Sequence, residues 1–179
     1  LRIAHQAEDL QAQIARWIGT DEPQSTLLLS PPGYGKTTLL REWVRYFSDR
    51  GFTAAIADER SEIAALADGV PQLAVGRCTD VMEGCSKWQA AVMLLKTMSP
   101  ALLALDEITA PEDAKAVSLC THCGTAVIAC AHAAGLDDLR QRPIYRELLA
   151  LGAFHQAVII EKQDGQRVYR MERWEETKC

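Results

Sequence analysis

Residues 30–38 read SPPGYGKTT, between a short apolar run at 26–30, TLLLS, and a segment of helical spacing that begins TTLLREW at 37–43. A strand, a glycine-rich loop and a helix in this order form an anion site, because loop N–H groups and the positive end of the helix dipole face the same point. The stretch therefore predicts a phosphate-binding loop. Ser30 stands where the usual pattern has its first glycine, and the prolines and Gly33 still allow the abrupt turn.

The predicted nucleotide-binding residues form one continuous segment: Pro32, Gly33, Tyr34, Gly35, Lys36, Thr37 and Thr38. Glycines let the backbone approach the phosphates, the lysine reaches the β and γ phosphates, and the hydroxyl after it binds Mg²⁺. We therefore expect ATP and Mg²⁺ as ligands, with Thr37 as one metal ligand. A glycine turn that only caps a helix is the alternative.

The stretch ALLALDE at 101–107 predicts that the nucleotide is hydrolysed. Asp106, at the end of an apolar parallel strand, is placed to orient the water shell of Mg²⁺ and is the second predicted metal ligand. Glu107 follows at once and is placed to orient or deprotonate the attacking water. This favours an ATPase over a small-molecule kinase, whose nucleophile comes from its substrate; a solvated acidic turn is the alternative.

Two further groups are expected at the same edge of the sheet. Asp58 and Glu59 end the strand predicted at 53–58, so Glu59 is a second candidate for holding water or metal. A salt bridge between Glu59 and Arg60 explains the same residues equally well. His132, at the tip of a later strand, is a third candidate catalytic residue, able to sense the γ phosphate, although a lone histidine is more often structural.

The rest of the chain alternates short apolar runs with segments of helical period, which predicts an α/β fold with a mostly parallel sheet and helices on both faces. Besides the elements above, the pattern predicts a leading helix over 1–19, strands at 101–106 and 125–130, and helices from Ser86 to Pro100 and over 111–122, 135–141 and 143–151. Two capping boxes, Ser86 to Gln89 and Thr109 to Glu112, start helices.

Asp-Gly at 164–165, between AVIIEK and RVYRME, predicts a C-terminal antiparallel hairpin with its turn at 163–166. In contrast, residues 59–85 have little periodicity, and we interpret them as a long functional loop.

Composition limits the alternatives. The chain has 179 residues, 48% of them hydrophobic, and no apolar run long enough for a membrane span. A net charge of −5 argues against nucleic acid or anionic lipid as a partner. The start LRIAHQAEDL has no signal-peptide pattern, so we interpret the cysteines as reduced thiols. Cys120 and Cys123 have metal-like spacing without a second such pair, which disfavours zinc.

Several motifs occur together in one order: SPPGYGKTTLLRE, ADERSEIAA, GVPQ, GRCTDVMEGCSK, TMSPALLALDEI, EDAKA, AHAAGLDDLRQRP and LLALGAF. In this order and spacing the chain closely resembles the ATPase domain of the stage III sporulation protein AA family, which is related to the type II and type IV secretion ATPases. The resemblance covers nearly the whole chain, and the stretches DERSEIA and TDV-x-x-GC-x-K make it specific.

The resemblance implies a RecA-like P-loop core, with 1–179 as one ATPase domain and the family's N-terminal domain absent. It also implies a homo-oligomeric, hexameric ring in the mother-cell cytoplasm, peripheral to a membrane channel complex. By position, Asp58 and Glu59 match the acidic box, Glu107 the catalytic glutamate and His132 the histidine box.

One departure concerns arginine. Where the family usually continues Gly-Arg after the acidic pair, this chain has Thr109 and Ala110. Arg77 and Arg142, with Arg140 beside the latter, are therefore candidates for charge stabilisation in a neighbouring subunit. Each of them is as easily an ordinary surface charge.

Two other functions compete with the ring motor. The first is a nucleotide-gated assembly module with little turnover, which the missing arginine favours and Glu107 opposes. The second is a nucleic-acid motor, which the acidic balance and the absence of an aromatic and basic strand-binding groove oppose.

Overall fold

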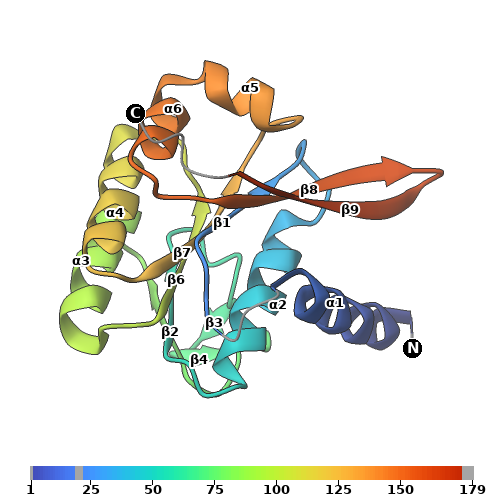
Figure 1. Cartoon of the computed structure of the whole chain (residues 1–179). Helices are drawn as coiled ribbons and strands as arrows, with labels where there is room; N and C mark the ends of the chain where they lie inside the picture. The colour runs from blue at the N-terminus through green and yellow to red at the C-terminus, as the bar shows by residue number, and fades with distance from the viewer. Residues whose placement is uncertain (1, 19–21, 175–179) are drawn as a thin grey trace.

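The computed structural model describes residues 2–18 and 22–174, with side chains from Leu10 onward. A seven-stranded sheet of order β5-β2-β6-β7-β1-β8-β9 runs through it (Figure 1). Every neighbouring pair is parallel except β8 and β9. The predicted α/β fold with a C-terminal antiparallel hairpin is confirmed. The strands are β1 (Thr26–Leu29), β2 (Ala54–Asp58), β5 (Thr79–Glu83), β6 (Leu102–Glu107), β7 (Ala126–Ala131), β8 (Gln156–Gln163) and β9 (Gln166–Arg173).

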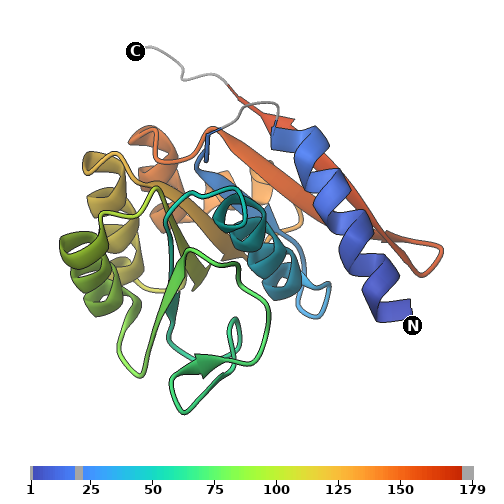
Figure 2. The same ribbon diagram turned by 90° about the horizontal axis from the view of Figure 1, so that it is seen from below.

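The helices cover both faces of this sheet, as predicted (Figure 2). Helices α1 and α2 pack on one face, and α3, α4, α5 and α6 lie toward the other. Leu27 and Leu29 of β1 join the cluster of α3 to α6, whereas Leu28 joins that of α1 and α2. Their bounds are α1 (Arg2–Ile18), α2 (Lys36–Ser48), α3 (Lys87–Met98), α4 (Pro111–His122), α5 (Leu136–Gln141) and α6 (Pro143–Ala150).

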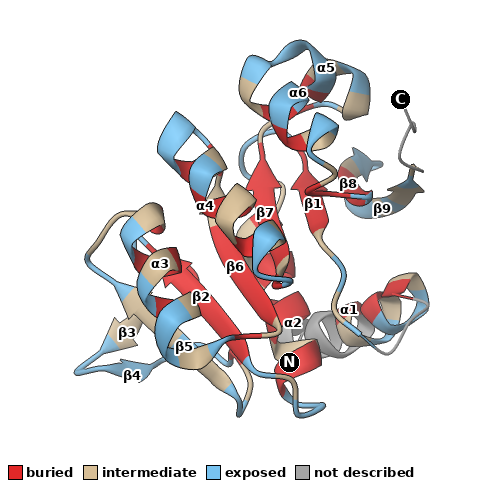
Figure 3. Cartoon of the chain, turned by 60° about the vertical axis from the view of Figure 1, so that its left-hand side comes forward, coloured by how far each residue is buried: buried red, intermediate tan, exposed pale blue. Residues whose placement is uncertain are grey.

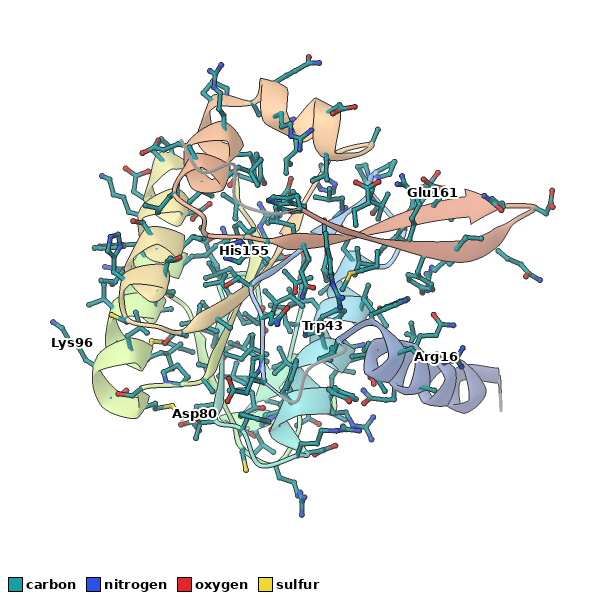
Figure 4. The ribbon with its side chains drawn as sticks, in the orientation of Figure 1. Arg16, Trp43, Asp80, Lys96, His155 and Glu161 are labelled. Atoms are coloured by element: carbon teal, nitrogen blue, oxygen red, sulfur yellow. The ribbon has the colours of Figure 1, made fainter. Side chains whose placement is uncertain are left out.

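The central strands are buried on both sides, which explains why they read as continuous apolar runs (Figure 3). All residues of β1 and β2 are buried. Helix α1 joins the same core: the Trp17 ring lies 6.3 Å from that of Trp43 and 5.4 Å from that of Tyr169. Trp43 projects from α2 in the centre of the molecule (Figure 4). The predicted end of the leading helix at Gly19 lies outside the described residues.

The interpretation of residues 59–85 as one long loop is wrong. Thr79–Glu83 form β5, which pairs in parallel with β2 and makes one edge of the sheet. Leu66–Ala67 (β3) and Val70–Pro71 (β4) form a separate small antiparallel ribbon. An edge strand is only half-buried, so β5 lacks the apolar run that identified the inner strands.

One of the two predicted capping boxes is correct. Ser86 caps α3 and accepts the N–H of Gln89, which reaches back in turn. Helix α4 instead has Ala110 at its N-cap, and the carboxylate of Asp113 accepts the N–H groups of Thr109 and Ala110. The prediction of Thr109 with Glu112 was therefore wrong by one residue, because an acceptor one position later satisfies the same free N–H groups.

The C-terminal hairpin turns at Asp164 and Gly165, both with positive φ (51° and 77°), as the Asp-Gly pair predicted. Its far half projects past the body of the molecule, and Glu161 lies on that projecting part (Figures 1 and 4). Burial along β8 falls accordingly, from fully buried at Gln156–Ile160 to exposed at Lys162. The hairpin is thus anchored at its base and exposed at its tip.

Within the described residues, no helix combines the length and apolarity that crossing a bilayer requires.

Candidate nucleotide site

The phosphate loop has the backbone that its glycines predicted. Gly33 and Gly35 have φ of 76° and 92°, a region that side chains disfavour, and α2 begins directly after at Lys36. The first N–H groups of α2 have no helical partner, and they face the loop. The local sequence therefore builds an anion-binding site at the N-terminus of α2, a helix of 13 residues.

A pocket of about 390 Å³ lies over this loop. Of the seven predicted nucleotide-binding residues, six line it: Pro32, Gly33, Gly35, Lys36, Thr37 and Thr38. Tyr34 points elsewhere, toward the C-terminal hairpin, where Lys162 lies 4.5 Å above its ring. Asp106 and Glu107 at the end of β6 and His132 just after β7 line the same pocket, so the side chains predicted from these two strand ends do meet.

The strand order explains this meeting. Asp106 lines the pocket over the phosphate loop although its strand β6 is not adjacent to β1, since β7 lies between them. His132 follows β7 directly, and its side chain lies between those of Lys36, the first residue of α2, and Glu107 at the end of β6. Because β7 lies between β1 and β6, His132 can contact both Lys36 and Glu107.

A β-bulge at Asp106 directs both acidic residues of β6 into the pocket. Leu105 pairs with Ala129 and Glu107 with Cys130, so Asp106 is the extra residue in the ladder. In a regular strand, successive side chains point to opposite faces. A bulge breaks that alternation and re-aims a side chain. Consequently Asp106 and Glu107 both line the pocket although they are neighbours in sequence.

Lys36, His132 and Glu107 form a hydrogen-bonded chain. The Lys36 Nζ lies 2.7 Å from the Nδ1 of His132, and the His132 Nε2 lies 3.0 Å from the Glu107 Oε2. An ammonium group only donates, so Nδ1 accepts and Nε2–H donates to the carboxylate. Lys36 also donates to the Ser30 carbonyl at 2.8 Å and to that of Pro31 at 3.2 Å.

Burial sets the acid–base character of the pocket. Desolvation lowers the pKa of Lys36, and the carboxylates of Glu107 and Asp106 oppose that shift. Desolvation raises the pKa of Asp106, and the nearby Glu62 raises it further. Both charged forms are thus disfavoured until an opposite charge compensates them. A phosphate anion would do this for Lys36, and a metal cation for Asp106.

The second acidic pair has a different environment. The buried Asp58 carboxylate accepts the backbone N–H groups of Glu62, Ile63 and Ala64 at 2.9–3.2 Å. Glu59 pairs with Lys87 at 2.7 Å rather than with Arg60, and it does not line the pocket. Its catalytic role stays a prediction, and the alternative salt bridge has a different partner from the one expected.

The candidate trans arginines lie outside the pocket. Arg77 is exposed and donates to the Asp49 carbonyl at 2.9 Å. Arg142 and Arg140 pair with Asp138 and Asp137 of α5, each at 3.2 Å. None of the three lines the pocket of its own chain, and their role toward a neighbouring subunit stays a prediction.

Sequence reasoning missed three charged residues of the pocket: Arg60, Glu62 and Arg167. The first two lie in the stretch DERSEIA at 58–64, where the acidic pair Asp58–Glu59 gave the stronger signal. Arg167 comes from the hairpin, and no local pattern links that strand to the phosphate loop.

The donor set fits the expected ligands. Thr37 and Asp106 offer the hard oxygen atoms that Mg²⁺ prefers. The loop and Lys36 offer N–H donors to phosphate. A larger hollow of about 800 Å³ between α4 and α6 has mostly apolar walls and is not lined by the phosphate loop. We therefore take the pocket at the phosphate loop as the candidate nucleotide site.

Comparison with known proteins agrees with this picture. The model of the family described as sporulation stage III, protein AA matches residues 1–171. Stage III sporulation protein AA of Bacillus subtilis (strain 168) is 34% identical over 170 residues, which cover 92% of this chain and 55% of that protein. The chain thus spans about half the length of this relative.

Two solved structures show the same fold. The VirB11 ATPase of the Brucella suis type IV secretion system, in complex with sulphate, has a TM-score of 0.61 at 15% identity, covering 96% of this chain and 53% of that one. The Legionella pneumophila ATPase DotB has a TM-score of 0.62 at 16% identity, covering 90% of this chain and 47% of that one. The RecA-like fold of secretion ATPases is thereby confirmed.

Proposed function

We propose that this chain, which belongs to the sporulation stage III protein AA family, binds ATP with Mg²⁺ at its phosphate loop and hydrolyses the ATP to ADP and phosphate. The observation that carries the proposal is the convergence of Lys36, Asp106, Glu107 and His132 on one pocket over the loop. A phosphate cradle alone would serve a binding protein. A carboxylate directed into the same pocket supplies what hydrolysis needs in addition.

The chain's own residues divide the work as follows. The loop N–H groups and Lys36 hold the phosphates, with Thr37 and Asp106 as ligands for the metal. Bound Mg²⁺ would neutralise charge on the β and γ phosphate oxygens. Glu107 accepts a proton from, or orients, the water that attacks the γ phosphate, which typically contributes ~10²–10⁴-fold to a rate.

His132 couples the phosphates to the base. Phosphate oxygens compete for the ammonium protons that Lys36 gives to Ser30, Pro31 and His132. When Lys36 turns to the nucleotide, the His132 Nδ1 loses its donor, and the imidazole can shift the carboxylate of Glu107 that it holds through Nε2. The side chain thus reports phosphate occupancy to the group that positions water.

The wider role follows the family. We place the chain in a homo-oligomeric, hexameric ring in the mother-cell cytoplasm, where a single ATPase domain serves a membrane channel complex. The secretion-system ATPases that share the fold support a motor of this kind. Arg142 or Arg77 would reach the site of a neighbouring subunit, since neither lines its own.

A second candidate is a nucleotide-gated assembly module with little turnover. The observation in its favour is that Glu107 is already held by His132, at 3.0 Å, instead of being free to accept a proton from water. In this version, ATP orders the ring and docks the membrane partner, and hydrolysis is slow.

The decisive experiment measures nucleotide binding and phosphate release with Mg²⁺-ATP over a series of protein concentrations. The wild type is compared with Lys36→Ala, which should lose binding, and with Glu107→Gln, which should bind ATP but release little phosphate. Specific activity that rises with concentration supports a motor completed between subunits. Equal binding without turnover in both the wild type and Glu107→Gln would support the gated module instead.

A further inference from the structure

The C-terminal hairpin places two basic residues against the phosphate loop. Lys162 of β8 and Arg167 of β9 are opposite each other in the ladder, so their side chains leave the same face of the hairpin. The Lys162 Nζ lies 4.5 Å from the centre of the Tyr34 ring. Arg167 covers the next loop residue: a Cβ added at Gly35 would lie 2.8 Å from its Cζ. Two consecutive loop residues are thus covered from one hairpin.

Arg167 differs from the other arginines on its strand. Arg170 pairs with Glu161 and Glu172, and Arg173 donates to Gln156. Among the described residues, the side chain of Arg167 has neither an ion pair nor a hydrogen bond, yet it lines the candidate nucleotide pocket. A guanidinium group has five N–H donors and matches phosphate geometry. Its charge therefore faces the place where phosphates would lie.

The tip of the hairpin has little other support. Beyond Ile160 the side chains of β8 become exposed, and a two-stranded ribbon without a packed face is only marginally stable. The contacts of Lys162 and Arg167 with residues 34 and 35 hold this part of the hairpin near the body of the molecule. These two side chains are therefore the contact between the phosphate loop and the tip of the hairpin.

Resting on the proposed function, we infer that Arg167 binds the phosphate groups of the nucleotide in the same subunit and fixes the β8–β9 hairpin over the phosphate loop. The hairpin is then an element whose order depends on nucleotide.

Binding measurements test the first half of this inference. We expect Arg167→Ala to weaken binding of Mg²⁺-ADP and of inorganic tripolyphosphate by roughly tenfold, the loss typical of a charged hydrogen bond. Arg167→Lys, which keeps the positive charge but lacks the planar set of guanidinium donors, should lose less affinity. The matched control is Arg170→Ala, three residues away on the same strand and outside the pocket, which should bind both ligands as the wild type does.

Hydrogen exchange of residues 160–169 tests the second half. Mg²⁺-ADP should slow exchange there in the wild type and in Arg170→Ala, but not in Arg167→Ala at matched ligand occupancy.

If the wild type binds Mg²⁺-ADP and Arg167→Ala binds it equally well, the inference is overturned and the proposed function stands. Loss of ADP binding without loss of tripolyphosphate binding would also overturn it, because Arg167 would then contact the nucleoside. A wild-type chain that binds neither ligand overturns the proposed function and the inference together.

Discussion

Two strands of the sheet end in the same pair of residues, Asp followed by Glu, and the chain uses the two pairs differently. Strands β2 and β6 are neighbours and parallel, so Asp58–Glu59 and Asp106–Glu107 leave the sheet side by side. Asp58 is buried under three backbone N–H groups and Glu59 is held by Lys87, whereas Asp106 and Glu107 line the pocket. The difference shows that the function of an acidic pair is set by the partners that the fold supplies.

The largest effect should separate the two glutamates. Glu107→Gln should lower phosphate release by about 10²–10⁴-fold, because an amide cannot accept the proton of the attacking water. Glu59→Gln, outside the pocket, should lower it by less than about tenfold, through a displaced Lys87 alone. Steady-state phosphate release with saturating Mg²⁺-ATP measures both. Equal losses would mean that the two pairs share the catalytic work.

The next largest effect should separate the two aspartates by stability. Asp58→Ala leaves the buried N–H groups of Ile63 and Ala64 and the partly buried N–H of Glu62 without an acceptor, and we expect it to lower the free energy of unfolding by about 3 kcal/mol. Asp80→Ala is the control, because this exposed aspartate lies on the adjacent edge strand β5 (Figure 4) and should change stability by less than about 0.5 kcal/mol. Denaturant unfolding provides the measurement. An Asp58→Ala chain as stable as the wild type would contradict a structural role for the Asp58 carboxylate.

Asp106→Asn should have the opposite sign and stabilise the protein. The pKa of Asp106 is raised from its ordinary value of 3.8, so the folded state binds the proton more tightly than the unfolded state does. Stability is then lost as pH rises from 3.8 through the folded pKa, and above it the ionised carboxylate is a cost. Asp106→Asn removes this cost, so we expect it to raise the free energy of unfolding at pH 7.

The pH dependence distinguishes this cause from an improvement in packing. The gain from Asp106→Asn should shrink as pH falls toward 3.8, where the aspartate is protonated in both states. Unfolding curves at several pH values between 4 and 8 follow it. A gain that does not change with pH would contradict the electrostatic account.

The smallest effect should come from Glu62, which repels the charge on Asp106. Glu62→Gln should lower the pKa of Asp106 and raise stability at pH 7 by a few tenths of a kcal/mol, because an exposed charge is well screened. In the Asp106→Asn background, the same substitution should do nothing. A double-mutant cycle measures the coupling between Glu62 and Asp106. Purely additive effects would show that the two carboxylates do not interact.

Local sequence was sufficient for the parts of the fold that local forces build. The phosphate loop needs glycines and a helix start, and the hairpin turn needs Asp-Gly, so both could be predicted. Continuous apolar runs identified β1, β2, β6 and β7 because these strands are buried on both faces. Strand β5 failed that test, since an edge strand is only partly buried.

The side-chain contacts of the site depend on strand order and on residues far apart in the sequence, and these could not be predicted. The candidates Glu107 and His132 came from strand ends, but their mutual contact depends on β7 lying between β6 and β1. The bulge at Asp106 is a property of the ladder with β7 and has no signature in LLALDE. The partner of Glu59 is Lys87, 28 positions along the chain, rather than the adjacent Arg60. Side-chain pairs of this kind are fixed by the tertiary fold.

The aromatic contact of α1 gives the molecule a built-in optical probe. The Trp17 ring packs against both Trp43 of α2 and Tyr169 of β9, at centroid distances of 6.3 Å and 5.4 Å. Tyr169 and Arg167 leave the same face of β9, two residues apart. A shift of the hairpin would therefore alter the surroundings of the indole, and its emission could follow nucleotide binding in unlabelled protein, in real time.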